Sequence, residues 1–404
     1  MPPTPHQGHV VVAPDKFKGS LEGAEAAARI AAGIRRAAPG TEVRELPVAD
    51  GGEGTLAAAL AAGFSRVPAE VAGPTGLPVD AALAVRDDTA VVELAQASGL
   101  ARLPGGRAAP LTAGSYGVGQ LIAKAVSLGV KRIVLGLGGS ACTDGGAGMV
   151  QALGARLRDA DGAELPAGGA ALRRLAEIDP GPLADALGGV EVVVACDVDN
   201  PLLGPRGAAA VYGPQKGADG ADLVALEAGL TRFADLVAEA TGRDVREAPG
   251  AGAAGGVGFA ALALLGATVR PGIELLLDLL DFDAAVRGAR LVVTGEGCLD
   301  AQTLHGKAPA GVAAAAARAG VRVAAVAGRL ELTEPEWRAA GFTAVIALTD
   351  LIDSTDPTDP TDPTGQTDLT DPTDLAERPG ESMARAAELA ELAGERLAQR
   401  LLSG

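Results

Sequence analysis

The segment 294–307 combines residues that could act on a phosphate. It holds two carboxylates and a lysine, Glu296, Asp300 and Lys307, among three glycines. It follows the apolar run 291–293, which is typical of a buried strand. Carboxylates can hold Mg²⁺, a lysine can neutralise phosphate, and glycines let the backbone approach a ligand. Because ligands bind at the carboxyl ends of parallel strands, the segment predicts a site for a metal-bound phosphate.

Two turns near the start of the chain repeat this design. Each follows a predicted strand and combines acidic residues with glycine. Lys18 precedes a predicted helix, whose N-terminus favours anions, although a solvated lysine and an ordinary helix cap are the alternative. The acid pair of the second turn favours function over a simple glycine turn. The candidate residues of these turns are Asp15, Lys18, Ser20, Asp50, Gly51, Gly52 and Glu53.

Later segments place further polar groups beside glycines or at strand ends. Loop 136–148 contains a G-x-G-x-x-A pattern with Asp159 further on, which is a weak dinucleotide signature and fits a phosphate cradle equally well. Asp197 follows the apolar strand 191–195, with an Asx turn before Pro201 as the structural alternative. The candidate residues of these segments are Gly138, Gly139, Ser140, Asp144, Asp197, Lys216, Gly252, Gly255 and Gly256.

The composition argues against several classes of protein. A length of 404 residues predicts two domains, and 48% hydrophobic residues suffice for large cores. With 2% aromatic residues, these cores must consist of Ala, Val and Leu. The net charge of -17 argues against nucleic-acid binding, so local cations and amides must bind any anionic substrate.

Cysteine spacing and hydropathy predict a cytoplasmic protein. Cys142, Cys196 and Cys298 match no metal-binding spacing, which favours reduced thiols. Residues 1–9 lack the apolar core of a signal peptide. The uncharged stretch 249–269 begins with glycine-rich sequence, so we expect a glycine loop before a buried helix and no membrane span. No motif specifies an oligomeric state.

Alternating strands and helices must position these groups. Such alternation implies parallel sheets with helices on their faces. The expected strands are 9–13, 43–48, 79–85, 89–94, 132–137, 191–195, 291–294, 321–327 and 342–347. The expected helices are 20–38, 55–62, 117–128, 146–153, 223–241, 308–319 and 382–402, with Ser20 as the N-cap of the first.

The order of these elements suggests one α/β domain inserted into another. We expect an outer domain from residues 1–73 and 284–404, and an inserted domain from residues 74–283. The Thr-Asp-Pro repeats at 354–374 predict a disordered insertion in the outer domain, because proline and acid at this density cannot build a core.

Eight ordered segments resemble the type-1 glycerate kinase family and span residues 10 to about 330. They are Ala13-Pro-Asp-Lys-Phe-Lys-Gly-Ser20, Pro47-Val-Ala-Asp-Gly-Gly-Glu-Gly-Thr55, Ser115-Tyr-Gly-Val-Gly119, Gly138-Gly-Ser-Ala-Cys-Thr-Asp-Gly-Gly146, Cys196-Asp-Val-Asp-Asn-Pro-Leu202, Pro214-Gln-Lys-Gly217, Gly250-Ala-Gly-Ala-Ala-Gly-Gly256, and Thr294-Gly-Glu-Gly297 with Asp300, Gln302, Gly306 and Lys307. The chain departs from the family pattern at Lys16, Gly114-Ser115 and Cys142-Thr143, and no acid or lysine is lost.

The resemblance implies ATP-dependent phosphorylation of D-glycerate with Mg²⁺. The expected product is 2-phosphoglycerate, with the 3-hydroxyl as the alternative position. The resemblance also implies that the inserted domain is flavodoxin-like and that the active-site cleft lies between the two α/β domains. A non-catalytic sugar-acid sensor and an NAD-dependent hydroxy-acid oxidoreductase are the competing functions.

Site roles follow from the resemblance and from the chemistry of phosphoryl transfer. Catalytic roles fall to Asp50, Asp197, Lys18 and Lys307. Substrate binding falls to Asp15, Lys18, Ser20, Gly51, Gly52, Glu53, Ser115 and Lys216. Nucleotide binding falls to Gly138, Gly139, Ser140, Asp144, Gly252, Gly255, Gly256, Gly295 and Gln302. The metal would be held by Asp197, Glu296 and Asp300.

Overall fold

The computed structural model describes residues 8–354 and 384–402. The chain divides into two compact units, which are Met1–Ala49 with Leu276–Gly404, and Asp50–Leu275. Each unit combines parallel strands with helices, which confirms the predicted α/β class. Most of the predicted Thr-Asp-Pro insertion, from residue 355 onward, lies outside the described residues. In the described parts of the chain, no helix combines the length and apolar character that a membrane span requires.

The unit built from both chain ends has a five-stranded parallel sheet in the order β13-β12-β11-β1-β2. The central pairing joins the two ends of the chain, because Pro14 lies opposite Gly295. Residues 10–13 are fully buried, as expected for a strand covered on both faces. The strands are β1 (His9–Pro14), β2 (Val43–Glu45), β11 (Ala289–Leu299), β12 (Arg322–Leu330) and β13 (Phe342–Ala347).

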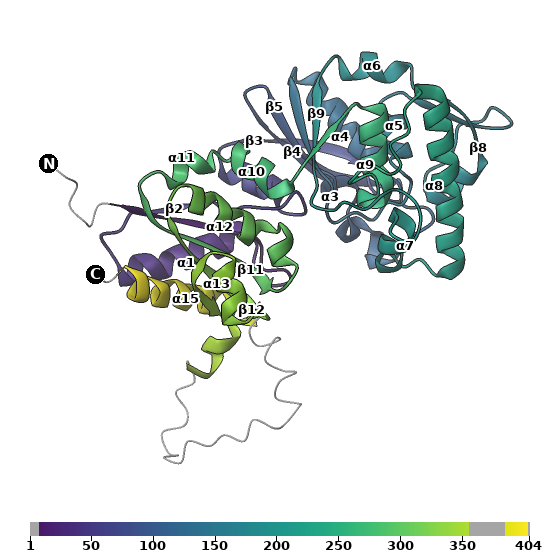
Figure 1. Cartoon of the computed structure of the whole chain (residues 1–404). Coiled ribbons are helices and arrows are strands. Elements are labelled where there is room, and N and C mark those ends of the chain that lie inside the picture. The colour runs from purple at the N-terminus through teal and green to yellow at the C-terminus, as the bar shows by residue number, and fades with distance from the viewer. Residues whose placement is uncertain (1–7, 355–383, 403–404) are drawn as a thin grey trace. The chain divides into compact units, whose positions relative to one another are not determined.

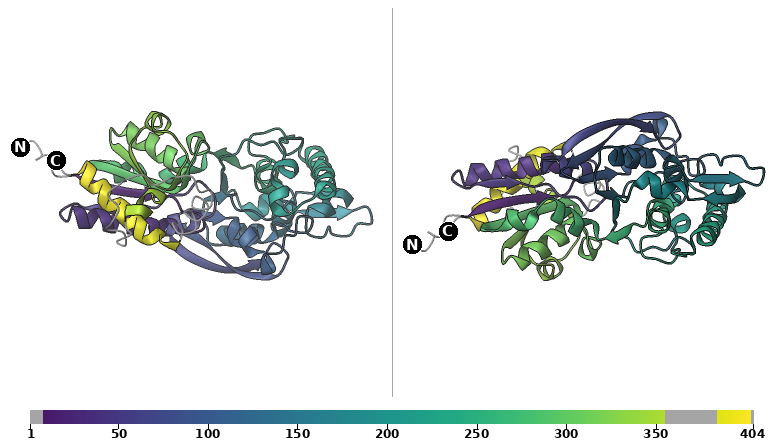
Figure 2. Two further views of the ribbon diagram at one scale, coloured as in Figure 1. Left: turned by 90° about the horizontal axis from the view of Figure 1, so that it is seen from below. Right: turned by 90° about the horizontal axis from the view of Figure 1, so that it is seen from above.

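Two helices from opposite chain ends pack together on one face of this sheet. Helix α1 (Gly23–Ala37) and helix α15 (Ala386–Leu401) lie side by side in both views of Figure 2. A Cβ atom on Gly33 would overlap the Glu391 carbonyl, so glycine permits this close approach. The predicted C-terminal docking helix is therefore confirmed. The other helices of this unit are α11 (Phe282–Val286), α12 (Ala308–Arg318) and α13 (Glu334–Ala339).

The first helix begins later than the sequence predicts. Its N-cap is Glu22, not Ser20, and the Ser20 hydroxyl donates to the Phe17 carbonyl at 3.1 Å. The reason is an extra turn, in which the Phe17 amide donates to the Leu21 carbonyl at 2.8 Å. Because both apolar side chains of this turn are buried, packing overrides the local capping signal.

The unit Asp50–Leu275 (Figure 1) has a six-stranded sheet, and its strand order is β10-β9-β6-β5-β4-β3. Its first four strands are parallel, and β4 and β3 are antiparallel. The strands are β3 (Ser65–Ala72), β4 (Pro78–Arg86), β5 (Thr89–Glu93), β6 (Arg132–Gly136), β9 (Glu191–Ala195) and β10 (Thr268–Arg270). A separate antiparallel pair consists of β7 (Arg156–Asp159) and β8 (Leu175–Asp179).

The sequence analysis missed β3, which changes the first domain boundary. Pro68 and charged residues break its apolar pattern, and proline is tolerated because β3 is an edge strand. Since β3 pairs with β4 along its whole length, the compact unit begins at Asp50 and not near Gly73. The second division falls within helix α10 (Gly272–Leu279).

The helices of this unit build one continuous core with its sheet. Helix α8 begins with a capping box, in which the Asp219 side chain accepts from the amides of Ala221 and Asp222. The helices are α2 (Thr55–Ala61), α3 (Ala95–Ser98), α4 (Tyr116–Ser127), α5 (Ala147–Ala152), α6 (Pro182–Leu187), α7 (Ala208–Tyr212), α8 (Gly220–Thr241) and α9 (Ala253–Leu264).

Candidate active site

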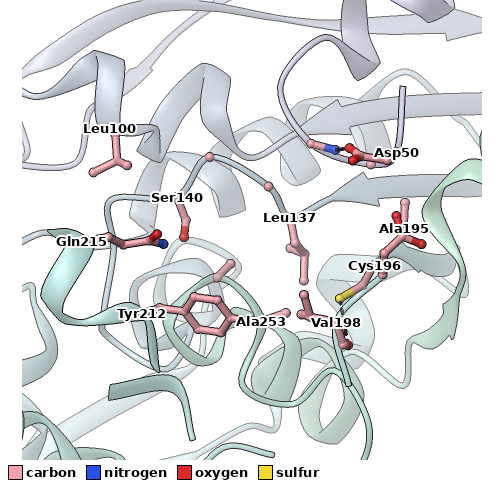
Figure 3. Close-up of a pocket in the computed structure, with 16 residues that line it drawn as sticks. Asp50, Leu100, Leu137, Ser140, Ala195, Cys196, Val198, Tyr212, Gln215 and Ala253 are labelled. Carbon is pink, nitrogen blue, oxygen red and sulfur yellow. Dashed lines mark hydrogen bonds between the residues drawn. The ribbon is translucent and has the colours of Figure 1, made fainter. Parts of the chain in front are cut away.

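A pocket of about 210 Å³ lies at the carboxyl ends of β6 and β9 in the unit Asp50–Leu275 (Figure 3). These strands are parallel neighbours, with Gly136 opposite Ala195, so the turns that follow them meet at one edge. The pocket is lined by Asp50, Gly51, Gly52, Leu100, Leu137, Gly138, Gly139, Ser140, Ala195, Cys196, Asp197, Val198, Tyr212, Gln215, Ala253 and Ala254. Seven predicted site residues are thus brought together: Asp50, Gly51, Gly52, Gly138, Gly139, Ser140 and Asp197.

Glycines allow the pocket turns to touch. Gly51 has a φ of +89°, and a Cβ there would lie 2.8 Å from the Ala195 carbonyl oxygen. The Gly138 amide donates to the Gly51 carbonyl at 3.2 Å, which ties two turns together. Glu53 packs on Gly139, where a Cβ would lie 2.7 Å from the Glu53 Cγ. Larger residues would therefore separate the turns and open the pocket wall.

Asp197 is the pocket group best suited to accept a proton. Its Oδ1 accepts the Gly272 amide at 2.7 Å. The pKa of Asp197 is raised to about 7: burial is the largest cause, the Gly272 hydrogen bond opposes it in part, and the charges of Asp50 and Glu274 add to the rise. A carboxylate with this pKa can take up a proton near neutral pH, as a general base must.

Asp50 is held at the same edge by its own turn. Its Oδ1 accepts the Gly52 amide at 3.1 Å. The Asp50 backbone also lies against Gly272, where a Cβ would overlap the Asp50 carbonyl oxygen. Asp50, Gly272 and Asp197 are therefore held together by direct packing, and the donor set that they offer consists of oxygen, which fits a hard divalent cation.

Lys216 lies behind the pocket wall. It is 2% exposed, and its Nζ donates to the Ser140 Oγ at 2.9 Å and to the Cys142 carbonyl at 2.7 Å. Burial lowers the pKa of Lys216, and the neighbouring Cys142 and Asp144 offset part of this effect. Lys216 is therefore connected to a ligand in the pocket through its hydrogen bond to Ser140.

Ser115 and Asp144 form a buried structural link outside the pocket lining. The Asp144 Oδ2 accepts the Ser115 amide at 2.8 Å, the Ser115 hydroxyl at 2.9 Å and the Gly148 amide at 3.1 Å. The Ser115 Oγ in turn accepts the Met149 amide at 2.9 Å. These bonds fasten the start of α4 to α5 and occupy the polar atoms that a ligand would use.

The glycines of the 250–258 loop serve mainly close packing. A Cβ on Gly252 would overlap the Pro201 carbonyl, and one on Gly255 would overlap the Cys142 carbonyl. Gly256 has a φ of +93° and lies against Gly145. The intervening residues Ala253 and Ala254, not these glycines, line the pocket.

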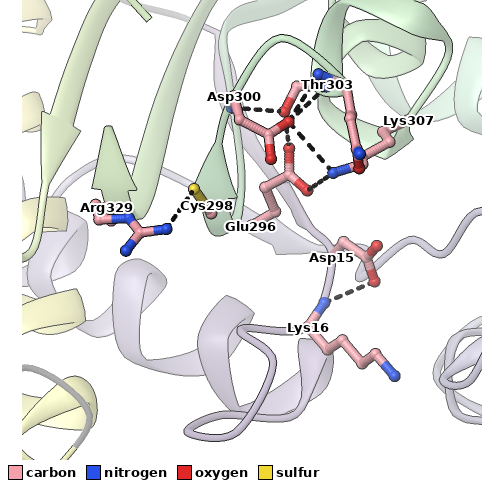
Figure 4. A network of polar contacts seen from close by, with 9 residues as sticks. Asp15, Lys16, Glu296, Cys298, Asp300, Thr303, Lys307 and Arg329 are labelled. Atoms are coloured by element: carbon pink, nitrogen blue, oxygen red, sulfur yellow. Dashed lines mark hydrogen bonds and ion pairs between the residues drawn. The ribbon is translucent and has the colours of Figure 1, made fainter. Parts of the chain in front are cut away.

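A second polar site occupies the end of β11 in the other unit (Figure 4). The sequence analysis predicted that this strand ends at residue 294. In the structure β11 continues to Leu299, so Glu296 lies within the strand. The reason is that β12 pairs with β11 up to Leu299 and satisfies its backbone. Asp15 lies beside this site because its amide donates to the Gly295 carbonyl at 2.8 Å.

Glu296, Asp300, Thr303 and Lys307 form the connected network of this site. The Thr303 hydroxyl donates to the Glu296 Oε1 at 2.5 Å. The Lys307 Nζ lies 3.4 Å from the Asp300 Oδ1 and 3.9 Å from the Glu296 Oε2. Burial raises the pKa of Asp300, but the Thr303 and Gln302 amides and the Lys307 charge outweigh it, so the pKa lies below its usual value.

Two further predicted residues, Gln302 and Lys18, lie next to this network. The Gln302 amide donates to the Asp300 Oδ1 at 2.8 Å. Lys18 is exposed, and its amide nitrogen would lie 3.0 Å from a Cβ on Gly297. Glu296 and Asp300 offer the oxygen ligands that Mg²⁺ prefers, and Lys307 offers a charge for phosphate.

The comparisons with known proteins agree with these motifs. The model of the glycerate kinase family matches residues 10–360. This chain belongs to the glycerate kinase family. It is 48% identical to the glycerate kinase of Bacillus subtilis (strain 168) and 45% identical to the glycerate 2-kinase of Escherichia coli (strain K12), in each case over 80% of this chain and 85% of the relative.

A solved structure shows that the similarity extends to the whole fold. It comes from Salmonella typhimurium LT2, belongs to a protein assigned as glycerate kinase 2, and is 41% identical to this chain. The superposition has a TM-score of 0.81 and covers 98% of this chain and 99% of the other. The resemblance predicted from the motifs is therefore confirmed at the level of family and fold.

The dinucleotide interpretation of loop 136–148 does not fit this family fold. A dinucleotide fingerprint opens a helix directly after its strand. Here α5 begins at Ala147, well after β6 ends at Gly136. Asp159 belongs to β7, which pairs with β8 in a separate sheet and does not end at the pocket.

Tyr212 and Gln215 line the pocket although the sequence analysis assigned them no role. The Tyr212 hydroxyl donates to the Asn200 Oδ1 at 2.6 Å, which fixes the ring at the pocket wall (Figure 3). The sequence signal for Tyr212 was weak: it is one of two tyrosines, and it lies two residues before the Pro214-Gln-Lys segment. Its ring and Leu100 supply apolar surface next to the polar turns.

Proposed function

We propose that this protein is a glycerate kinase, which transfers the γ-phosphoryl group of ATP to D-glycerate. The 2-hydroxyl is the proposed acceptor, and the products are 2-phosphoglycerate and ADP. The names of the relatives support the reaction, and the name of the Escherichia coli relative supports the position. The observation that carries the proposal is the pocket lined by Asp50, by the glycine-rich turn 138–140 and by Asp197, whose carboxylate is fixed by the Gly272 amide.

The polar wall of the pocket is suited to bind phosphate oxygens. Residues 138–140 present backbone amides and one hydroxyl to the pocket. Among the described residues, the Gly139 and Ser140 amides donate no hydrogen bond to the protein. Free amides in a glycine-rich turn form an anion-binding concavity. The Tyr212 ring and Leu100 provide the apolar surface that a nucleoside requires.

Asp197 acts as the proton acceptor in this proposal. Its ionised carboxylate takes the proton from the glycerate hydroxyl, and the hydroxyl oxygen forms a bond to the γ-phosphorus. The bond between this phosphorus and the bridging oxygen breaks, and ADP leaves with that oxygen. Burial, together with the nearby Asp50 charge, keeps the Asp197 pKa high, so the proton is held until the product departs.

We assign the magnesium ligands to Glu296 and Asp300 and the neutralising charge to Lys307. Their oxygen donors and the adjacent ammonium match the chemistry of a metal-bound phosphate. When bound with ATP, Mg²⁺ would supply positive charge to neutralise the phosphates. Among the residues of this network, Thr303 orients Glu296 and the Gln302 amide orients Asp300.

An assay with D-glycerate and MgATP tests this function. Enolase acts on 2-phosphoglycerate, so coupling to enolase without phosphoglycerate mutase reports phosphorylation at the 2-position. A signal that requires the mutase would place the phosphate on the 3-hydroxyl. Absence of glycerate-dependent ADP release would refute the kinase assignment.

A further inference from the structure

The ammonium group of Lys216 reaches the pocket wall from the protein interior. Its two hydrogen-bond acceptors, the Ser140 Oγ and the Cys142 carbonyl, belong to one loop after β6. Residues 137–140 of this loop line the pocket, whereas Lys216 does not. The loop is therefore a thin wall with a buried cation on one side and the pocket on the other.

This cation has no contacting counter-ion among the residues that the structure describes. Its polar contacts are a hydroxyl and a carbonyl, both neutral. The charge of the Asp144 carboxylate raises the pKa of Lys216, but this carboxylate accepts hydrogen bonds from Ser115 and Gly148. Burial lowers the pKa of Lys216 and so disfavours its ammonium form, and an anion on the far side of the wall would stabilise this charge.

The hydroxyl of Ser140 connects the Lys216 ammonium to the pocket. Because its oxygen accepts an N–H of Lys216, the hydroxyl proton points away from the ammonium. Ser140 is 8% exposed and lines the pocket. The cation polarises the hydroxyl, which makes it a stronger donor to an anion.

We infer that Lys216 is a positioning residue that binds phosphate indirectly, by fixing and polarising the Ser140 hydroxyl as a donor to the nucleotide. The identity of the anion rests on the proposed kinase function. The inference explains why a lysine in this position stays out of the pocket: it acts through the wall and leaves space for the phosphate. It also predicts that Lys216 and Ser140 work as one unit.

A double-mutant cycle on ADP binding tests this coupling. We would measure the affinity for ADP by calorimetry in the wild type, Lys216→Met, Ser140→Ala and the double variant. Each single variant should lose about 10- to 100-fold in affinity, because a charge-assisted hydrogen bond is lost. The double variant should bind within about threefold of Lys216→Met, because both changes break the same path. The exposed Lys131→Met is the matched control for a lost lysine charge, and its affinity should not change.

Several outcomes would overturn the inference. If the fold losses of ADP affinity in the two single variants multiply in the double variant, Lys216 acts independently of Ser140. A lowered melting temperature with unchanged ADP affinity would mean a purely structural role. If Lys216→Met does not fold, the ADP affinities of Ser140→Ala and Ser140→Thr are compared. Equal affinities would refute the role of the residue-140 hydroxyl as a donor to the nucleotide.

The same experiment separates this inference from the proposed function. A wild type that binds ADP but does not phosphorylate glycerate would refute the glycerate kinase assignment, and the coupling would still be judged from the ADP affinities. A wild type that does not bind ADP would overturn the inference, whatever the assay with glycerate shows.

Discussion

The pocket in the unit Asp50–Leu275 and the network at the end of β11 use the same residue types in different settings. In the pocket, Asp197 is partly buried beside two other acids, and its pKa rises to about 7. In the β11 network, Asp300 accepts backbone amides beside Lys307, and its pKa falls. Both follow buried parallel strands.

The difference teaches that the surroundings of an acid, not its motif, determine its chemistry. Burial and like charge favour the protonated form, and amide donors and a cation favour the ionised form. A raised pKa suits a group that must accept a proton. A lowered pKa suits one that must stay charged and bind a cation. The two sites are therefore expected to respond differently to substitution.

The largest effect is expected for Asp197→Asn. The amide cannot accept a proton, so turnover with glycerate should fall by about 10²- to 10⁴-fold. Thermal unfolding should change little, since the Gly272 amide keeps an oxygen acceptor. The exposed neighbour Asp199, which pairs with Arg206, supplies the control Asp199→Asn. Equal turnover of the two variants would contradict the assigned role.

A smaller effect is expected for Lys307→Met in the β11 network. Loss of one charge-assisted contact should lower kcat/KM for MgATP by about 10- to 100-fold. The Asp300 pKa should rise, because one of the influences that depress it is removed. Carboxyl NMR titration would measure this shift. Lys307→Arg keeps the charge and should recover part of the activity. An unchanged Asp300 pKa in Lys307→Met would show that the amides alone control it.

Thr303→Val tests whether the network needs its hydrogen bond. The change leaves the buried Glu296 Oε1 without its hydroxyl donor, which should cost about 1–3 kcal/mol of unfolding free energy. Chemical denaturation would measure it. Thr333→Val removes a similar bond to Glu336 at an exposed helix cap and should cost about 1 kcal/mol. The reverse order would contradict the importance of burial.

The smallest effect is expected for Glu274→Gln, which removes one of the like charges around Asp197. The wild-type kcat/KM should fall as the pH drops below about 7, because protonated Asp197 cannot act as a base. Without the Glu274 charge the Asp197 pKa should decrease, so this acidic limb should move to lower pH. Glu239→Gln on the exposed face of α8 is the control. A limb that moves to higher pH would contradict the electrostatic assignment.

Much of the secondary structure could be predicted from the chain. Strand 342–347 matches β13, and the helix predicted over 308–319 matches α12 within one residue. The misses have physical causes. Strand β3 was not predicted because Pro68 interrupts its apolar pattern. The first helix starts later than predicted because the buried side chains of Phe17 and Leu21 belong to an extra turn before it. Neither tertiary pairing nor packing can be seen in local periodicity.

The sequence by itself determined the family and the polar segments, most of which it placed correctly after strands. Motif order and glycine spacing suffice for this, because they reflect local backbone requirements and a shared ancestry of fold. The tertiary structure alone decided which of these groups face a pocket. It placed Asp197 beside Asp50, hid Lys216 behind Ser140, and used Asp144 and Ser115 as a buried link. These roles depend on burial and on contacts between distant segments, which a linear sequence does not contain.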